Sequence, residues 1–204
     1  MRLHLNKPGV RALGVAESFS QGERTSVLAG VVMRSDYLID GLSLGRTKVG
    51  GDDATSSIAA LYRRLSRNDV SLLMVSGAIL SLYNVIDVDS LSSRTKLPVV
   101  CLTYKETAGI EDSIRRHFPE GAESKLAAYR RLGRRVGVRL HTGHRVYVRT
   151  SGLEKADALR ILDAFTLQGS VPEPIRVAKL LARAVAARRS LPRGSSSRVD
   201  RTGP

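Results

Sequence analysis

Apolar residues recur in short runs through the first half of the chain, and polar turns separate the runs. Runs at 10–16, 25–34 and 36–49 have the length and composition of strands, and the last two are close enough to form an antiparallel hairpin. Runs at 70–77 and 97–104 are apolar on both faces, as central parallel strands are. The pattern therefore predicts five strands.

Two helical segments separate the later strands. Residues 54–67 place apolar side chains three and four positions apart, and residues 88–95 (VDSLSSRT) are expected to form a short helix. The order strand, strand, strand, helix, strand, helix, strand indicates a mixed sheet, in which three antiparallel strands precede two parallel ones and helices cover both faces. We therefore predict an α/β fold of the ribonuclease-H-like architecture, in which catalytic carboxylates lie at strand ends and hold divalent metal.

The second half is mainly helical. Residues 110–118 and 123–135 predict two helices, 138–150 a hairpin with Thr-Gly near its turn, and 153–166 and 172–189 two further helices. The two prolines that begin the last segment fit the first turn of a helix, where their missing N–H is tolerated.

Length and composition indicate one domain over residues 1–189, followed by a basic tail at 190–204 with the composition of disordered chain. No run of 18 uncharged apolar residues occurs, and the amino end lacks the apolar centre of a signal peptide. We therefore expect a cytoplasmic protein with no membrane segment. The single cysteine, Cys101, lies in an apolar strand and is expected to be buried and structural.

The formal charge of +14 changes this picture because it is confined to two segments. Residues 125–149 carry eight basic residues and no acid, and residues 176–204 carry eight bases against one acid. The rest of the chain has 17 bases and 18 acids, and is close to neutral. Such a distribution favours a surface for a polyanion, with nucleic acid first, over evenly spread solubilising charge.

Four acids stand in unusual places. Glu17 ends the first strand, Asp52 and Asp53 follow two glycines at the start of a helix, and Asp87 follows Asn84 just beyond the fourth strand. Converging carboxylates are what metal-dependent phosphodiester hydrolysis requires, and magnesium prefers oxygen ligands. If the first and fourth strands are neighbours, their carboxyl ends bring Glu17 and Asp87 together.

Each acid also has a structural interpretation. Asp53 and Asp87 can cap the helices that follow them, and Glu17 can be an exposed strand end. The histidines of HTGH, His141 and His144, match no familiar zinc spacing. There is no Walker loop and no GxGxxG motif.

The segment YRRLGRRVGVR combines Arg130, Arg131, Arg134 and Arg135 with Tyr129. This density of arginine suits phosphate contacts, and an interleaved aromatic ring can stack on an exposed base. The alternative is an ordinary solvated helix face.

Several blocks resemble one known family, the archaeal domain-of-unknown-function 99 or endonuclease dU family, which is homologous to endonuclease V. They are ALGVAESF, LAGVVMRSDYLIDG, GGDDAT, SLYNVIDVDSL, LPVV and LQGSVPEPIRVAKLLARA, in family order from residue 10 to about 185. The resemblance implies a ribonuclease-H-like fold and a Mg²⁺- or Mn²⁺-dependent endonuclease that acts near deaminated bases.

At two positions the sequence lacks an acid that the resemblance implies. Ala16 stands where the family resemblance places a metal-binding aspartate, and Ser76 stands where endonuclease V has an aspartate at the end of the fourth strand. Regular extended backbone points Ala16 and Glu17 to opposite faces, so Glu17 replaces the missing acid only if the strand bulges or ends there. Ser18 and a nearby glycine are compatible with such an ending.

Three hypotheses follow. In the first, the protein is a metal-dependent nuclease acting on nucleic acid, DNA before RNA, in which Glu17, Asp53 and Asp87 bind metal, assisted by Asp52, Asn84 and Ser18. In the second, it keeps the fold and binds nucleic acid without catalysis. The third is a hydrolase of small phosphate compounds. Both a monomer and a homodimer are compatible with the sequence.

Overall fold

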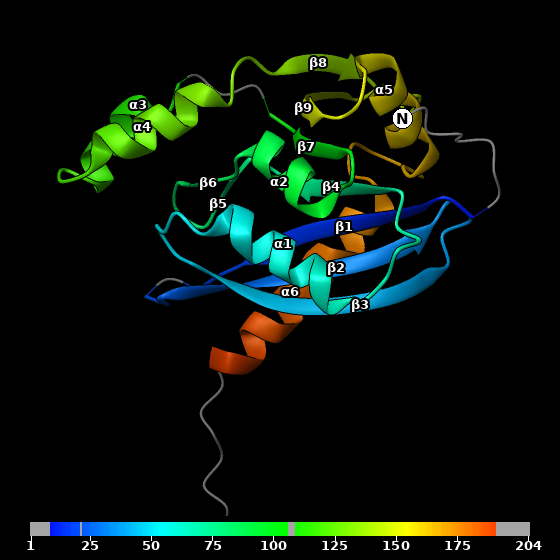
Figure 1. Cartoon of the computed structure of the whole chain (residues 1–204), viewed down its shortest axis with the longest axis horizontal. Helices are drawn as coiled ribbons and strands as arrows, with labels where there is room; N and C mark the ends of the chain where they lie inside the picture. The colour runs from blue at the N-terminus through cyan, green and yellow to red at the C-terminus, as the bar shows by residue number, and fades with distance from the viewer. Residues whose placement is uncertain (1–8, 21, 106–108, 191–204) are drawn as a thin grey trace, which may run out of the picture.

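A seven-stranded mixed sheet forms the centre of the molecule (Figure 1). The computed structural model describes residues 9–20, 22–105 and 109–190. The strands of the sheet, in chain order, are β1 (Arg11–Ser18), β2 (Thr25–Arg34), β3 (Ile39–Lys48), β4 (Leu72–Ser76), β7 (Val99–Thr103), β8 (Val136–Arg139) and β9 (Arg145–Ser151). The short strands β5 (Ile79–Leu80) and β6 (Asn84–Val85) form a separate hairpin.

The strand order across the sheet is β3-β2-β1-β4-β7-β9-β8. The first three strands pair antiparallel, whereas β1, β4 and β7 run parallel to one another. This arrangement confirms the predicted three antiparallel strands followed by two parallel ones. The predicted hairpin is also formed, and it extends the sheet beyond the prediction because β9 pairs antiparallel with β7.

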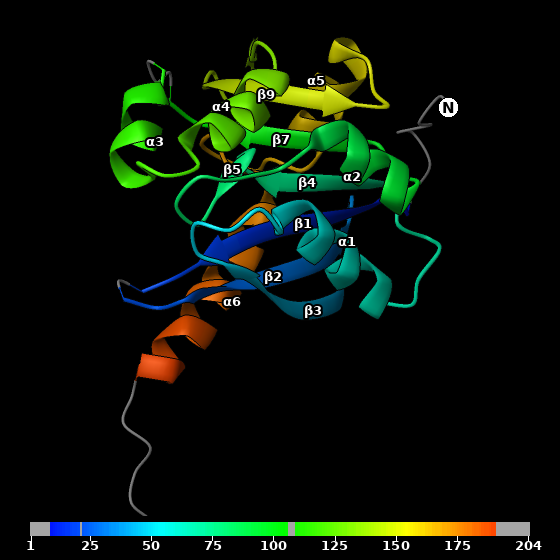
Figure 2. The same ribbon diagram turned by 60° about the vertical axis from the view of Figure 1, so that its left-hand side comes forward.

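Helices cover both faces of the sheet, as predicted (Figure 2). The helices are α1 (Ala54–Arg64), α2 (Val88–Thr95), α3 (Glu111–His117), α4 (Ala122–Arg131), α5 (Lys155–Ala164) and α6 (Glu173–Ser190). Leu13 and Val15 of β1 share a buried cluster with residues of α1 and α2, while Ala12 shares one with residues of α5. Because side chains alternate along a strand, successive residues of β1 pack into the cores on opposite faces of the sheet.

Helix α6 lies directly against β1 and β2, and small residues make this approach possible. A Cβ atom added at Gly14 would lie 2.3 Å from the carbonyl carbon of Pro174. Ala178 and Ala182 are fully buried on the same helix. Since the contact is between backbone and backbone, only glycine fits at residue 14.

Helices α1 and α4 both end earlier than predicted, α1 at Arg64 instead of residue 67. Helix α4 ends at Arg131, four residues earlier than expected, because Gly133 turns into the left-handed region with φ of 63°. The predicted tail at 190–204 lies outside the described residues from 191 onward. Within the described part of the chain, no helix is long and apolar enough to cross a membrane.

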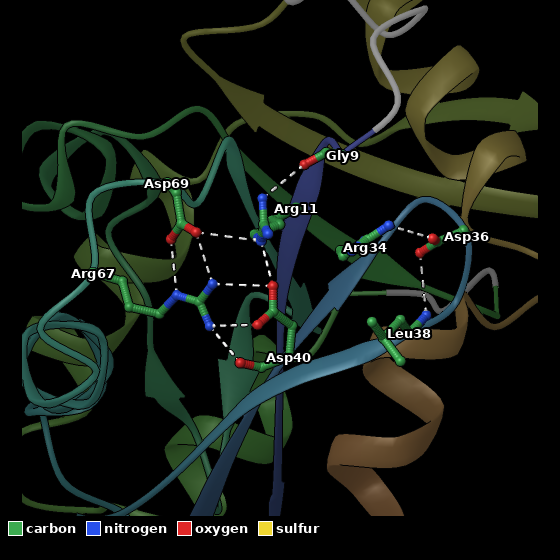
Figure 3. A network of polar contacts seen from close by, with 8 residues as sticks. All are labelled: Gly9, Arg11, Arg34, Asp36, Leu38, Asp40, Arg67 and Asp69. Atoms are coloured by element: carbon green, nitrogen blue, oxygen red, sulfur yellow. Dashed lines mark hydrogen bonds and ion pairs between the residues drawn. The ribbon is translucent and has the colours of Figure 1, made fainter.

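The amino ends of β1 and β3 are joined by an ion-pair network (Figure 3). Asp40 accepts hydrogen bonds from Arg11 and Arg67, and Arg67 Nη2 lies 2.7 Å from Asp69 Oδ2. Hydrogen bonds from Arg67 and then Arg11 lower the pKa of Asp40 to about 2. This network fastens the end of the sheet opposite to the carboxyl ends of the parallel strands.

Candidate functional site

The carboxyl end of β1 carries Ala16 and Glu17, and the strand is regular through both. Ala16 pairs with Ala29, Glu17 with Leu28, and the strand continues to Ser18 without a bulge. Ala16 is buried in a cluster with Ala178 of α6. Glu17 therefore points to the opposite face, and it does not take the position of the acid that the resemblance expects at residue 16.

Glu17 instead holds the turn after β5. Ser81 donates two hydrogen bonds to its carboxylate, from the backbone N to Oε1 at 3.0 Å and from Oγ to Oε2 at 2.6 Å, and Ser26 Oγ donates a third. Residues 81–83 have φ of 31°, 57° and 63°, a run of left-handed backbone without glycine. Such a conformation costs roughly 1–2 kcal/mol per residue. Glu17 thus stabilises a strained turn.

The partly buried Asp53 and the fully buried Asn84 form one hydrogen-bonded pair. Asn84 Nδ2 lies 2.7 Å from Asp53 Oδ1, and Asp53 also accepts hydrogen bonds from Thr47 and Ser57. Burial acts to raise the pKa of the Asp53 carboxyl, but hydrogen bonds, led by those from Asn84 and Thr47, outweigh it and lower the pKa. Hydrogen-bond donors of the protein therefore surround the Asp53 carboxylate.

The expected capping bond of Asp53 at the start of α1 is not formed. Asn84, a buried residue from another hairpin, performs this task, because its Oδ1 accepts a hydrogen bond of 2.9 Å from the Ala54 amide. The Asp53 carboxylate turns back toward Thr47 instead. Sequence spacing could not show this exchange, since Asn84 reaches the helix from 30 positions away.

Asp52 is exposed, and its partner is a lysine that the sequence analysis missed. Lys125 of α4 donates to Asp52 Oδ1 at 2.9 Å and to the Gly51 carbonyl at 3.0 Å, and its Nζ lies 4.7 Å from the ring centroid of Phe118. The Lys125 side chain is only 7% exposed. Its helical spacing from buried Leu126 and Ala122 is the signal that could have placed it on the inner face.

Asp87 caps α2, as its structural interpretation predicts: it accepts a hydrogen bond of 2.8 Å from the Ser90 amide. Its exposed side lines a cavity of about 590 Å³ that Asp52 and Asp89 also line. We call this the aspartate cavity. It brings together two of the four predicted acids, Asp52 and Asp87, whereas Glu17 and Asp53 are not among its lining residues.

The donor set does not fit a magnesium or manganese centre. Within the described ranges, no group of three Asp, Glu, His or Cys side chains is close enough to hold one ion. Glu17 and Asp53 are bound to protein donors, and Ala16 and Ser76 provide no carboxylate. Val15 of β1 pairs with Val75 of β4, so the residues that follow them, Ala16 and Ser76, lie side by side at the ends of adjacent parallel strands. The metal-binding assignment of the acids stays a prediction.

The predicted arginines lie where α4 leads into β8. Arg130, Arg131 and Arg134 are exposed, and Arg131 lines the aspartate cavity. Arg135 packs over the ring of Tyr147, 5.7 Å from its centroid. The β8–β9 hairpin supplies three further basic residues that the sequence analysis did not single out. These are Arg139, Arg145 and Arg149.

The remaining candidates have structural partners. His141 Nδ1 lies 3.3 Å from Asp163, and His144 Nδ1 lies 3.2 Å from the Thr142 carbonyl. Cys101 is buried, as expected, and burial raises the pKa of its thiol to about 12.

Comparisons with known proteins agree on one family. The family model described as Endonuclease dU matches residues 8–186. A UPF0215 protein of Pyrobaculum aerophilum is 36% identical over 83% of this chain and 91% of its own length. A UPF0215 protein of Pyrobaculum calidifontis is 37% identical over 85% of this chain and 95% of its own length.

Solved structures share the fold. A protein of unknown function from Archaeoglobus fulgidus has a TM-score of 0.73 at 24% identity, covering 86% of this chain and 98% of that one. Endonuclease V from Ciona intestinalis, solved with DNA containing an inosine followed by a ribo-adenosine, has a TM-score of 0.59 at 14% identity, covering 91% of this chain and 88% of that one. The fold is therefore the ribonuclease-H-like fold of endonuclease V.

Proposed function

Because the chain belongs to the Endonuclease dU family, we propose that it binds nucleic acid through a basic surface and that this binding requires no metal centre. The surface is formed by the end of α4 and the outer face of the β8–β9 hairpin. Its members are Arg130, Arg131, Arg134, Arg135, Arg139, Arg145 and Arg149. The concentration of arginine at this edge of the sheet is the observation that carries the proposal.

The arrangement of the hairpin supports a binding role. Val146 and Val148 are buried toward α5, so alternation turns Arg145, Tyr147 and Arg149 to the outer face. Arg145 lies 5.4 Å from the centroid of the Tyr147 ring. Guanidinium groups around an aromatic ring can contact phosphates while the ring offers a face for a base.

The proposal separates binding from cleavage because the candidate carboxylates already have partners. Glu17 is bonded to the turn at Ser81, Asp53 to Asn84, and Asp87 to the first turn of α2. A metal ion would have to compete with these donors for the carboxylate oxygens or share the oxygens with them. We therefore assign them to the scaffold. Location in the cytoplasm stays a prediction.

A second candidate function is metal-dependent cleavage of DNA near uracil or inosine. Two observations favour it: the family's description as Endonuclease dU, and the aspartate cavity, in which Asp52, Asp87 and Asp89 line one space. A rearrangement that draws these three acids together would be required.

Binding is tested by fluorescence anisotropy with labelled single-stranded DNA, duplex DNA and RNA in EDTA at increasing salt. The double variant Arg130→Gln/Arg134→Gln should bind more weakly and show a shallower salt dependence, by about 0.7 per lost contact to a single strand. The matched control is Arg46→Gln/Arg63→Gln, which removes two exposed charges on β3 and α1. Equal losses in both variants would overturn the proposal.

Cleavage is tested on uracil- and inosine-containing DNA with Mg²⁺ or Mn²⁺. The proposal expects intact strands. Metal-dependent nicking that disappears in Asp87→Asn would establish the second candidate, and nicking lost in Glu17→Gln would assign that residue to the site. Failure to bind any polynucleotide at low salt would favour a hydrolase of small phosphate compounds.

A further inference from the structure

A second cavity, of about 270 Å³, opens at the carboxyl ends of β4 and β7. We call it the basic pocket. Its polar lining residues come from five strands and helices and from the segments between them: Ser76, Thr103, Tyr104, Tyr129, Arg135, Arg149 and Lys179. In open α/β sheets, ligands usually bind at the carboxyl ends of parallel strands. The basic pocket adjoins the basic surface proposed above and shares Arg135 and Arg149 with it, whereas Tyr104 and Lys179 have no role in the functions discussed so far.

The charge of the basic pocket is of one sign. Arg135, Arg149 and Lys179 line it, and no Asp or Glu does so among the described residues. Arg149 is held in place by hydrogen bonds from Nε and Nη2 to the Gly133 carbonyl. Burial, followed by the nearby Arg135, lowers the pKa of Arg149. Like charges brought together in this way are stabilised by an anion and repel a divalent cation.

Tyr104 adds a buried hydroxyl that interacts with the Ser76 side chain but forms no well-aligned hydrogen bond with it. Its hydroxyl oxygen is shielded from water and makes no hydrogen bond of normal geometry within the described part of the chain. Burial raises the pKa of this hydroxyl to about 12, so it keeps its proton at neutral pH. A buried donor of this kind lowers stability until an acceptor reaches it. An anionic oxygen in the basic pocket would be such an acceptor.

We propose that the basic pocket binds one phosphate group of a nucleic-acid strand directly, through Lys179, Arg149 and the Tyr104 hydroxyl. The inference rests on the proposed function and adds the place where the strand is anchored. The volume is just below the range of about 300–1,000 Å³ that is usual for drug-sized ligands, and it suits a phosphate with its sugar. Ser76 contributes a hydroxyl where a carboxylate would repel the anion.

The test compares Lys179→Gln with Arg183→Gln. Both residues are exposed on α6, one turn apart, but Arg183 is not a lining residue of the pocket. In EDTA, Lys179→Gln should weaken binding of a labelled single-stranded oligonucleotide roughly tenfold, as expected for a lost charge-assisted contact. It should also reduce the salt slope by about 0.7, while Arg183→Gln changes affinity less than twofold. Equal effects in the two variants would overturn the pocket assignment.

Two further arms separate this inference from the proposed function. Tyr104→Phe, which removes only the hydroxyl, should weaken binding two- to fivefold without lowering thermal stability; unchanged affinity would remove Tyr104 from the site. Inorganic pyrophosphate should bind by calorimetry and compete with the oligonucleotide in a Lys179-dependent way. If the oligonucleotide fails to bind at all, the proposed function fails and pyrophosphate binding alone decides whether the pocket takes phosphate. If binding of pyrophosphate depends on Lys179 but binding of the oligonucleotide does not, the ligand of the pocket is a free phosphate compound. The assignment of the pocket to a nucleic-acid strand is then wrong.

Discussion

Replacing Asn84 by alanine is the sharpest test of the view that the predicted acidic site is part of the scaffold. Asn84 is fully buried and lies within hydrogen-bonding distance of four polar groups. Its Oδ1 accepts from the Ala54 amide, and the two N–H groups of its Nδ2 are shared among Asp53, Thr47 and the Lys48 carbonyl, all at 2.7–3.0 Å. Alanine leaves all of these groups without this partner.

The expected loss follows from those contacts. A buried polar group left unsatisfied costs about 1–3 kcal/mol. The Ala54 amide is inaccessible and bears the full cost, whereas Asp53 keeps other donors and the Lys48 carbonyl is near the surface. We therefore expect a loss of about 3–4 kcal/mol in the free energy of unfolding, which corresponds to roughly 6–16 °C in Tm for a chain of this size.

The loss should also depend on pH. The pKa of Asp53 is lowered in the folded state, so its contribution is fully present above the unfolded value of about 4 and is lost as pH falls below it. Removing the Asn84 donor raises the folded pKa of Asp53. The difference in stability between wild type and Asn84→Ala should therefore shrink as pH falls from 7 to 3.

Urea denaturation followed by circular dichroism measures both effects, with Asn68→Ala as the control at an exposed asparagine. The control should change stability by less than about 0.5 kcal/mol. A loss below about 1 kcal/mol in Asn84→Ala would refute the scaffold assignment. So would a loss seen only with Mg²⁺ present, because that result would show that Asn84 and Asp53 act through a bound ion.

Three other predictions concern the scaffold. Gly14→Ala should lower the free energy of unfolding by about 2–3 kcal/mol because its Cβ would overlap Pro174. Gly45→Ala is the control and should be nearly neutral, because the nearest atoms lie 3.4 Å from the added Cβ; equal Tm values in the two variants would contradict this. Asp40→Asn should lower the urea midpoint at pH 7, and the difference should shrink as pH falls from about 4 through 2, the folded pKa, where wild-type Asp40 also loses its charge; a difference undiminished at pH 2 would exclude the ion pairs as its cause. Cys101 should not react with Ellman's reagent at pH 8 in the folded protein and should release one equivalent in guanidinium chloride; rapid reaction of the native thiol would show that this strand is exposed.

The sequence by itself determined the order and direction of the central strands and the covering of both faces. These features depend on periodicity within single segments, which each segment carries independently. The capping role of Asp87 and the burial of Cys101 were open to the same local reasoning, because the partner of Asp87 is three residues away and the strand around Cys101 is apolar throughout. The β8–β9 hairpin was predicted as an element, but its place in the sheet was not.

The candidate site was decided by tertiary structure. Glu17 meets Ser81 across 64 positions, and Lys125 meets Asp52 across 73. No periodicity records such pairs, because a hydrogen bond depends on where two side chains meet after the chain has folded. Whether a carboxylate in a sequence motif binds a metal or accepts structural hydrogen bonds therefore depends on which donors surround it in the folded protein. Here folding surrounds Glu17 and Asp53 with donors and gathers Arg149, Lys179 and Tyr104 around a pocket.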